Sequence, residues 1–206
     1  MPRMPCASAV LLIRSLLATT LLAAPAAAQD DVEIPEAAKG FVAPGTRPIA
    51  YQAADLNRDG REDAILVLER QKAKADDPEI EDGQRPLLVL VRQADGSLRE
   101  AARNAKVVYC RTCGGVMGDP FQGVVAGPGT FTVSLAGGSS WRWGVEYRFA
   151  YSRRDDQWQL VRVEETSFHA SEAAEGKPTV STPPKHFGKI DLASFDPENW
   201  KNQGPR

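Results

Sequence analysis

The segment 141–151 constrains the fold more than any other part of this sequence. Large apolar residues occupy every second position along it, from Trp141 to Tyr151, and charged or small residues stand between them. Because successive side chains of a β-strand point to opposite faces, the pattern places all the large residues on one face of a strand. An apolar pattern returns over 157–165 after a charged turn, so we expect a long antiparallel hairpin.

The remaining patterns also favour strands. The sequence predicts further strands over 48–54, 64–69, 86–91, 97–102 and 129–136. A helix is expected only over 30–43, with Pro35 in its first turn, while the proline-rich segment 172–185 predicts a loop and 186–192 an edge strand. We therefore expect a mainly β fold, a single domain of antiparallel hairpins with a short N-terminal helix.

The first 28 residues have the pattern of a secretory signal peptide. Arg3 and Arg14 precede an apolar run over 15–24, and small residues follow up to Ala28. The run is shorter than the roughly 20 apolar residues that a membrane-spanning helix needs, and no later segment approaches that length. We expect removal of 1–28, a β-rich domain over 29–200, a flexible tail over 201–206, and a periplasmic or secreted protein without a transmembrane segment.

The charge balance argues against a nucleic-acid partner. The chain of 206 residues has 25 basic and 27 acidic side chains, and the predicted leader holds two of the arginines and no acid. Removal of the leader leaves a formal charge of −4, which offers little to a phosphate backbone. A protein or a glycan is the kind of partner that we expect.

The two cysteines outside the leader, Cys110 and Cys113, are expected to form a disulfide. An exported protein meets an oxidising compartment, where a disulfide persists. The alternative is a thiol oxidoreductase site, which favours a first cysteine at a helix N-terminus. Glycines and Pro120 follow this pair instead, and they disfavour a helix. Zinc is also disfavoured, because His169 and His186 lack the spacing of a ligand pair.

The segment 55–63 carries the most informative short motif. Oxygen-bearing side chains recur at every second position, a glycine then permits a sharp turn, and a further carboxylate follows. Ca²⁺ takes six to eight oxygen ligands, which such a loop supplies. The predicted ligands are the side chains of Asp55, Asn57, Asp59 and Asp63 and the backbone carbonyl of Arg61. An EF-hand is disfavoured because Leu66 stands where its glutamate belongs, and an acidic turn without metal is the alternative.

This motif resembles the calcium loop between two strands in FG-GAP or integrin-alpha-type propeller blades. The likeness covers 48–103, because the apolar run 87–92 and the turn at Asp95 look like the next hairpin of such a blade. The sequence holds one copy of the motif, and a propeller needs at least four blades. The resemblance therefore implies a calcium-loop hairpin and not a complete propeller.

Three further segments resemble a family of exported bacterial proteins. They are the cysteine segment 109–115 and the glycine-containing segments 118–123 and 137–143. The resemblance implies a periplasmic or secreted bacterial protein with a Cys-x-x-Cys turn, and it implies nothing about chemistry.

Catalytic motifs are not found in the sequence. It holds no nucleophile elbow, no phosphate-binding glycine loop and no His-Glu-x-x-His. A carboxylate pair for glycoside hydrolysis can be drawn from Asp119 with Glu146 or Glu164, although a chain with this many acids offers such pairs anywhere. Ser167 and His169 share a strand face, an arrangement more typical of a surface pair.

We therefore expect no catalytic residues and a non-enzymatic binding or envelope-support role for an exported, calcium-stabilised protein. Asp119 lies in the glycine-rich turn and is the best single candidate for an unexpected role. The approach over 137–140 is expected to leave Trp141 at a sheet rim, where a glycan or a protein partner can stack, and Trp143 is a further candidate binding residue. The alternative is a periplasmic enzyme, either a thiol oxidoreductase using Cys110 and Cys113 or a hydrolase.

Overall fold

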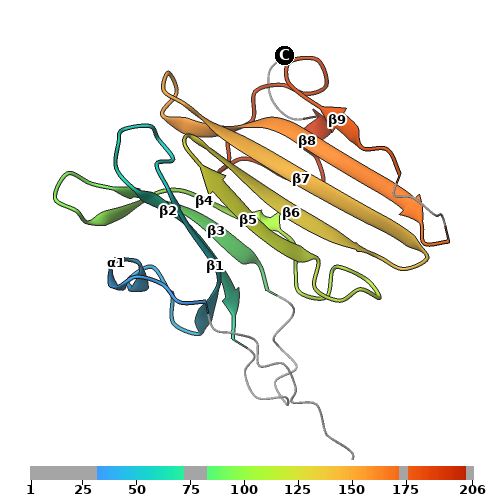
Figure 1. Cartoon of the computed structure of the whole chain (residues 1–206), viewed down its shortest axis with the longest axis horizontal. Helices are drawn as coiled ribbons and strands as arrows, with labels where there is room; N and C mark the ends of the chain where they lie inside the picture. Colours follow the sequence, from blue (N-terminus) through green and yellow to red (C-terminus); the bar gives the residue numbers. More distant parts are fainter. Residues whose placement is uncertain (1–31, 72–82, 172–175, 203–206) are drawn as a thin grey trace, which may run out of the picture. The chain divides into compact units, whose positions relative to one another are not determined.

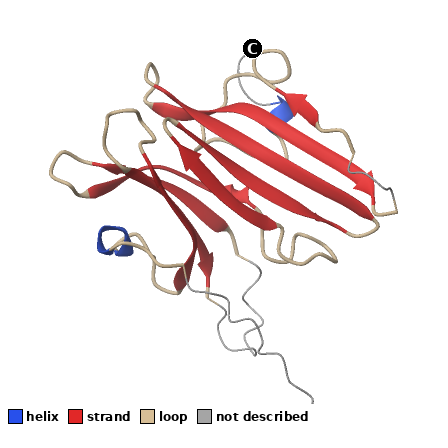
Figure 2. Ribbon diagram, viewed as in Figure 1, coloured by secondary structure: helices blue, strands red, loops and turns tan. Residues whose placement is uncertain are grey.

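The computed structural model describes residues 32–71, 83–171 and 176–202 (Figure 1). These residues form two antiparallel sheets with very little helix (Figure 2). The expected mainly β fold of antiparallel hairpins is confirmed, and the described strands do not form a propeller. The predicted signal peptide, 1–28, lies outside the described residues.

Both sheets are meanders, in which each strand pairs with its neighbours in the sequence. Sheet A contains β1 (Thr46–Ala54), β2 (Asp63–Arg70), β3 (Arg85–Arg92) and β4 (Leu98–Val108) in that order. Sheet B contains β5 (Phe121–Gly127), β6 (Thr130–Gly138), β7 (Trp141–Ser152), β8 (Gln157–His169) and β9 (Thr179–Ser181). The helix α1 (Glu36–Lys39) precedes sheet A, and the 3₁₀ helix η1 (Trp200–Asn202) follows sheet B.

The larger hydrophobic core joins one face of each sheet. The predicted alternation of 141–151 is observed in β7, whose Val145, Tyr147 and Phe149 all lie in this core. Phe149 stacks on Phe131 of β6 with ring centroids 5.1 Å apart and meets Phe195 edge-on at 5.4 Å. The segment after β9 thus contributes aromatic side chains to the same core as the two sheets.

A second, smaller core covers the other face of sheet A. Ala38 of α1 lies buried there against Leu66 of β2 and Leu88 and Leu90 of β3, with Phe41 packed beside them. Because both faces of β2 and β3 are covered, these strands have continuous apolar runs instead of an alternation. The packing of the short N-terminal helical segment on sheet A therefore accounts in part for the continuous apolar runs of β2 and β3.

The N-terminal helix is much shorter than the 30–43 predicted. It begins after Pro35, which provides no side-chain cap, and ends at Gly40. A helix of four residues gains little from its own hydrogen bonds, so its stability comes from the packing of Ala38.

Three assignments in the second half of the chain also differ from prediction. The strand β5 lies in a glycine-containing segment where none was predicted, and β9 lies in the predicted loop 172–185. The segment 186–192 is not a strand, because only one isolated bridge, between Gln159 and Asp191, joins it to β8. Pairing partners, rather than local composition, determine these short elements.

Within the described residues, the chain ends in the 3₁₀ helix η1. The 3₁₀ helix η1 includes two residues of the predicted tail 201–206, and residues 203–206 lie outside the described part of the chain. Trp200 is buried against Phe187. Among the described residues, no helix has the length and apolar character needed to cross a membrane.

Candidate functional site

The predicted calcium loop connects β1 to β2 and closes on its own hydrogen bonds. The carboxylate of Asp55 accepts from the backbone N–H groups of Asp59 and Gly60, both at 3.0 Å. The side-chain oxygen of Asn57 accepts from the same Asp59 N–H, also at 3.0 Å. Gly60 has a φ of 85°, which a glycine adopts without strain. The side chains of Asp55, Asn57 and Asp59 therefore surround one turn.

Asp63, the fourth predicted side-chain ligand, has a different environment. It is fully buried, and its two oxygens accept hydrogen bonds from the backbone N–H groups of Leu56, Asn57 and Arg92 at 2.9, 3.2 and 2.9 Å. Burial raises the pKa of Asp63, and these hydrogen bonds only partly oppose that rise. Asp63 thus fastens the loop to the end of β3.

The loop fits a calcium site only in part. Asp59 also forms an ion pair with Arg61, Oδ2 to Nη2 at 2.5 Å, and its contacts with Asn57 and Arg61 outweigh desolvation and lower its pKa. Among the residues that the structure describes, no three His, Cys, Asp or Glu side chains converge as a metal site. Asp55, Asn57 and Asp59 are suitable oxygen donors in chemistry and position, whereas Asp63 is committed to the backbone.

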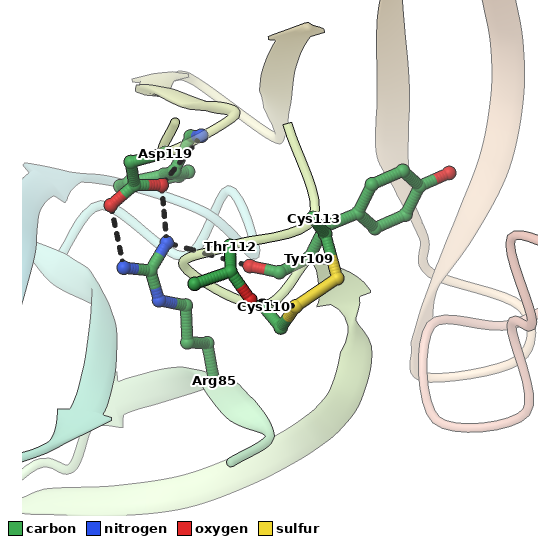
Figure 3. Close-up of a disulfide and its surroundings, with 7 residues drawn as sticks. Arg85, Tyr109, Cys110, Thr112, Cys113 and Asp119 are labelled. Carbon is green, nitrogen blue, oxygen red and sulfur yellow. Dashed lines mark hydrogen bonds and ion pairs between the residues drawn. A yellow bond between two sulfur atoms is a disulfide. The ribbon is translucent and has the colours of Figure 1, made fainter. Parts of the chain in front are cut away.

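The sulfur atoms of Cys110 and Cys113 lie 2.03 Å apart, which is disulfide-bonding distance (Figure 3). The backbone N–H of Cys113 donates to the carbonyl of Cys110 at 3.1 Å, and the chain continues through turns. Gly114 follows at a crowded position, since an added Cβ would lie 2.2 Å from the carbonyl oxygen of Gly118. The expected pairing is seen, on a turn and not at the start of a helix.

A buried arginine lies beside this turn and binds Asp119. The Arg85 side chain is 2% exposed, and its two terminal nitrogens contact the two Asp119 oxygens at 2.6 Å each. Asp119 also accepts a hydrogen bond from the backbone N–H of Phe121 at 3.0 Å. Although desolvation raises the pKa of Asp119, the contacts with Arg85 and Phe121 hold it below its usual value. Asp119 is therefore an anchor between β3 and the start of β5.

Arg85 belongs to a larger charged cluster that sequence reasoning missed. Its Nη2 atom also contacts Oε2 of Glu69 at 2.5 Å, and the other Glu69 oxygen pairs with Arg47 at 2.5 Å. Arg111 of the cysteine turn approaches Glu69 at 4.0 Å. The cluster thus connects β1, β2 and β3 with the cysteine turn. Arg85 begins an apolar strand, and nothing in its local sequence distinguishes it from an exposed strand terminus.

An aromatic surface lies on the other side of the cysteine turn. In Figure 3 the ring of Tyr109 points away from the guanidinium of Arg85. The face of β7 that carries the core becomes exposed toward the start of the strand, from Val145 at 8% through the half-buried Trp143 to Trp141 at 61%. Strand pairing places Ser167 of β8 opposite Trp143. We call Tyr109, Trp141, Trp143 and Ser167 the aromatic shelf.

Three residues of the aromatic shelf, Tyr109, Trp143 and Ser167, line a depression of about 570 Å³, and Trp141 precedes Trp143 on the same face of β7. The floor of the depression contains the buried Tyr147 and Trp200, and Glu165, Lys177 and Lys201 stand among the polar groups lining it. The hydroxyls of Tyr109 and Tyr147 lie 3.0 Å apart. Burial raises the pKa of both tyrosines, so their hydroxyls stay protonated near neutral pH.

The residues considered for hydrolysis contact other groups. His169 bonds through Nδ1 to the hydroxyl of Ser171 at 2.7 Å rather than to Ser167, and its ring meets Trp141 edge-on at 5.3 Å. Glu146 and Glu164 lie opposite each other on β7 and β8, where Glu164 pairs with Arg162 at 2.5 Å. Asp119 is paired with Arg85 as described above.

Comparisons of the chain with protein-family models, with curated proteins and with solved structures found no match. Both resemblances drawn from the sequence stay predictions.

Proposed function

We propose that this chain is an exported, calcium-stabilised β protein that binds a ligand without transforming it, and that the aromatic shelf is its binding surface. The observation that carries the proposal is the exposure along β7, where Trp143 lines a depression and Trp141, two residues earlier on the same face, is 61% exposed. A protein that exposes a large aromatic side chain beside a concavity commonly uses it for binding. Export is supported by the signal-peptide pattern of 1–28.

The surroundings of the shelf support binding rather than catalysis. The candidate acid Asp119 neutralises a buried arginine, and the candidate base His169 contacts Ser171 and Trp141. The cysteine pair begins immediately after Tyr109 in the sequence and closes the turn that follows it. A protein-disulfide exchange role would require the same pair to open.

The proposal predicts ligand binding at the shelf without turnover. We expect purified protein to change its tryptophan fluorescence saturably with a member of a panel of oligosaccharides and peptides, and the Trp141→Ala variant to lose most of that response. Panels of ester and glycan substrates and an insulin-reduction assay are run in parallel. A hydrolytic activity abolished by His169→Ala, or an insulin reduction abolished by Cys110→Ser in a folded variant, overturns the proposal.

Calcium is expected to stabilise the native state through the loop 55–63. A ligand that binds only the native state at a hundredfold excess over its Kd adds about 2.7 kcal/mol to the free energy of unfolding. We expect a saturable rise of the melting temperature with CaCl₂, reversed by EDTA and lost in Asp59→Asn. Asp95→Asn, which changes an exposed aspartate in the β3–β4 turn, should keep the full response. A wild-type melting temperature that does not respond to calcium contradicts this part of the proposal.

A further inference from the structure

We infer that the ligand of the aromatic shelf is an oligosaccharide of β-linked pyranose units, an inference that rests on the proposed function. A pyranose ring has an apolar C–H face and an edge of hydroxyl groups. An aromatic side chain suits the face, because it offers a large rigid apolar surface. Hydrogen-bonding side chains around the ring suit the edge.

The aromatic side chains stand where a sugar ring can reach them. Trp141 and Trp143 lie on one face of β7, so they are about 7 Å apart along the strand. The rings of Trp143 and Tyr109 are 5.9 Å apart and tilted by 50°, which gives the depression two aromatic walls. Gly137 leaves room for Trp143, since an added Cβ would lie 2.6 Å from its ring.

The polar side chains provide both donors and acceptors. Glu165 offers carboxylate oxygens, Lys177 offers an ammonium group, and Ser167 offers a hydroxyl that both donates and accepts. Lys201 pairs with Glu165 at 3.1 Å and lies 5.0 Å from the centre of the Trp200 ring. Sugar hydroxyl groups both donate and accept hydrogen bonds, so they can pair with this mixture of groups, whereas a lipid hydrocarbon chain can form no hydrogen bonds with them.

The low aliphatic content of the depression also favours a carbohydrate ligand. Of the described side chains lining it, only Val145 and Pro197 are aliphatic beyond a methyl group. A site for a leucine-rich or isoleucine-rich peptide presents more branched aliphatic surface. The combination of aromatic rings and polar groups with few aliphatic side chains therefore favours a carbohydrate.

The extent of the concave surface favours a chain of sugars over a single unit. A second depression, of about 520 Å³, adjoins the first, since Tyr109 and Pro197 line both. Cys110, Cys113 and Glu198 are among the residues that line this second depression. An extended β-linked chain can follow such a surface and present several ring faces along it.

The test measures binding of defined hexasaccharides by calorimetry and tryptophan fluorescence. Cellohexaose and the hexamer of N-acetylglucosamine are the β-linked probes, and maltohexaose is the α-linked comparison. We expect saturable binding of at least one β-linked probe and weaker binding of maltohexaose. Trp141→Ala should weaken the binding about tenfold, the value of one lost aromatic contact, and Trp141→Phe should restore part of it. Ser167→Ala should also weaken it.

The controls separate this inference from the proposed function. Val125→Ala changes an exposed apolar residue on β5, away from the shelf, and should leave the affinity unchanged. Melting curves establish that each variant is folded. If neither β-linked probe binds, or if Trp141→Ala has no effect, the sugar inference is overturned. If a peptide binds instead in a Trp141-dependent manner, the inference fails and the binding function stands. Turnover of a bound sugar, abolished by His169→Ala, overturns both.

Discussion

Replacing Arg85 by methionine is expected to lower the free energy of unfolding by about 3–5 kcal/mol. The substitution keeps an unbranched apolar stem but removes the only charge that contacts both Glu69 and Asp119 among the described residues. Glu69 is buried, and it would retain its carboxylate with Arg47 as its close partner. Removing one member of a buried ion pair costs far more than removing an exposed one, because the remaining charge has lost its solvation. Denaturant unfolding of the two proteins measures the difference.

The matched control is Arg103→Met. Arg103 forms two hydrogen bonds with Glu100 on the surface of β4, at 2.8 and 2.7 Å, and its loss should cost less than about 1 kcal/mol. Equal effects of the two substitutions would contradict the assigned role of Arg85.

The cluster also predicts a dependence of stability on pH. The pKa of Asp119 is lowered in the folded protein, so the unfolded chain binds more protons and stability rises with pH in this range. The contribution of Asp119 is complete above the ordinary pKa of an aspartate and is lost as the pH falls through the lowered value. Arg85→Met should reduce this part of the acid dependence, which unfolding curves over that range measure.

The second large effect is expected for Asn104→Leu, at about 3 kcal/mol of lost stability. Asn104 is 4% exposed, and its side-chain nitrogen donates to the carbonyls of Leu192 and Phe195 at 2.7 and 2.8 Å. Its side-chain oxygen accepts from the backbone N–H groups of Lys106 and Val107, both at 2.7 Å. Leucine has a similar volume but leaves four backbone groups without this partner.

The consequence extends to the depression beside the aromatic shelf, because the segment that Asn104 holds carries Phe195 and leads to Trp200, which lines that depression. We expect Asn104→Leu to increase limited proteolysis between 190 and 202 and to weaken ligand binding. Asn202→Leu, at an exposed position of η1, is the control and should change stability by no more than about 0.5 kcal/mol. A stable, protease-resistant Asn104→Leu variant would contradict this role of Asn104 and show that the other contacts of the C-terminal segment are sufficient to hold it.

The hairpin of β7 and β8 shows how much local pattern can predict. The expected strand over 141–151 corresponds to Trp141–Ser152, and its large side chains do share one face. The alternation with a period of two involves only neighbouring residues, so it can be recognised in the sequence without knowledge of the fold. The pairing of Cys110 with Cys113 was likewise predictable, because both lie in one short turn.

The roles of single residues were predicted less well. Asp119 was singled out for its position in a glycine-rich turn, but its partner Arg85 lies 34 residues earlier. Asp63 was predicted as a metal ligand, and its burial under the backbone of Leu56 and Arg92 depends on how β2 meets β3. Such contacts form between segments that are distant in the sequence, and the residues of one segment do not indicate which other segment it will contact.

Amino-acid order was thus sufficient for the β class, the main hairpin and the cysteine turn, since each follows from side-chain alternation or from residues a few positions apart. The packing of the sheets decided which polar residues were buried, as for Arg85 and Asn104, and how far along β7 the core extended. Trp141 and Trp143 follow the same alternation as Phe149, and only the end of the core between Phe149 and Trp141 leaves Trp141 exposed. Burial is a property of the assembled chain, because it depends on which distant segment covers each face.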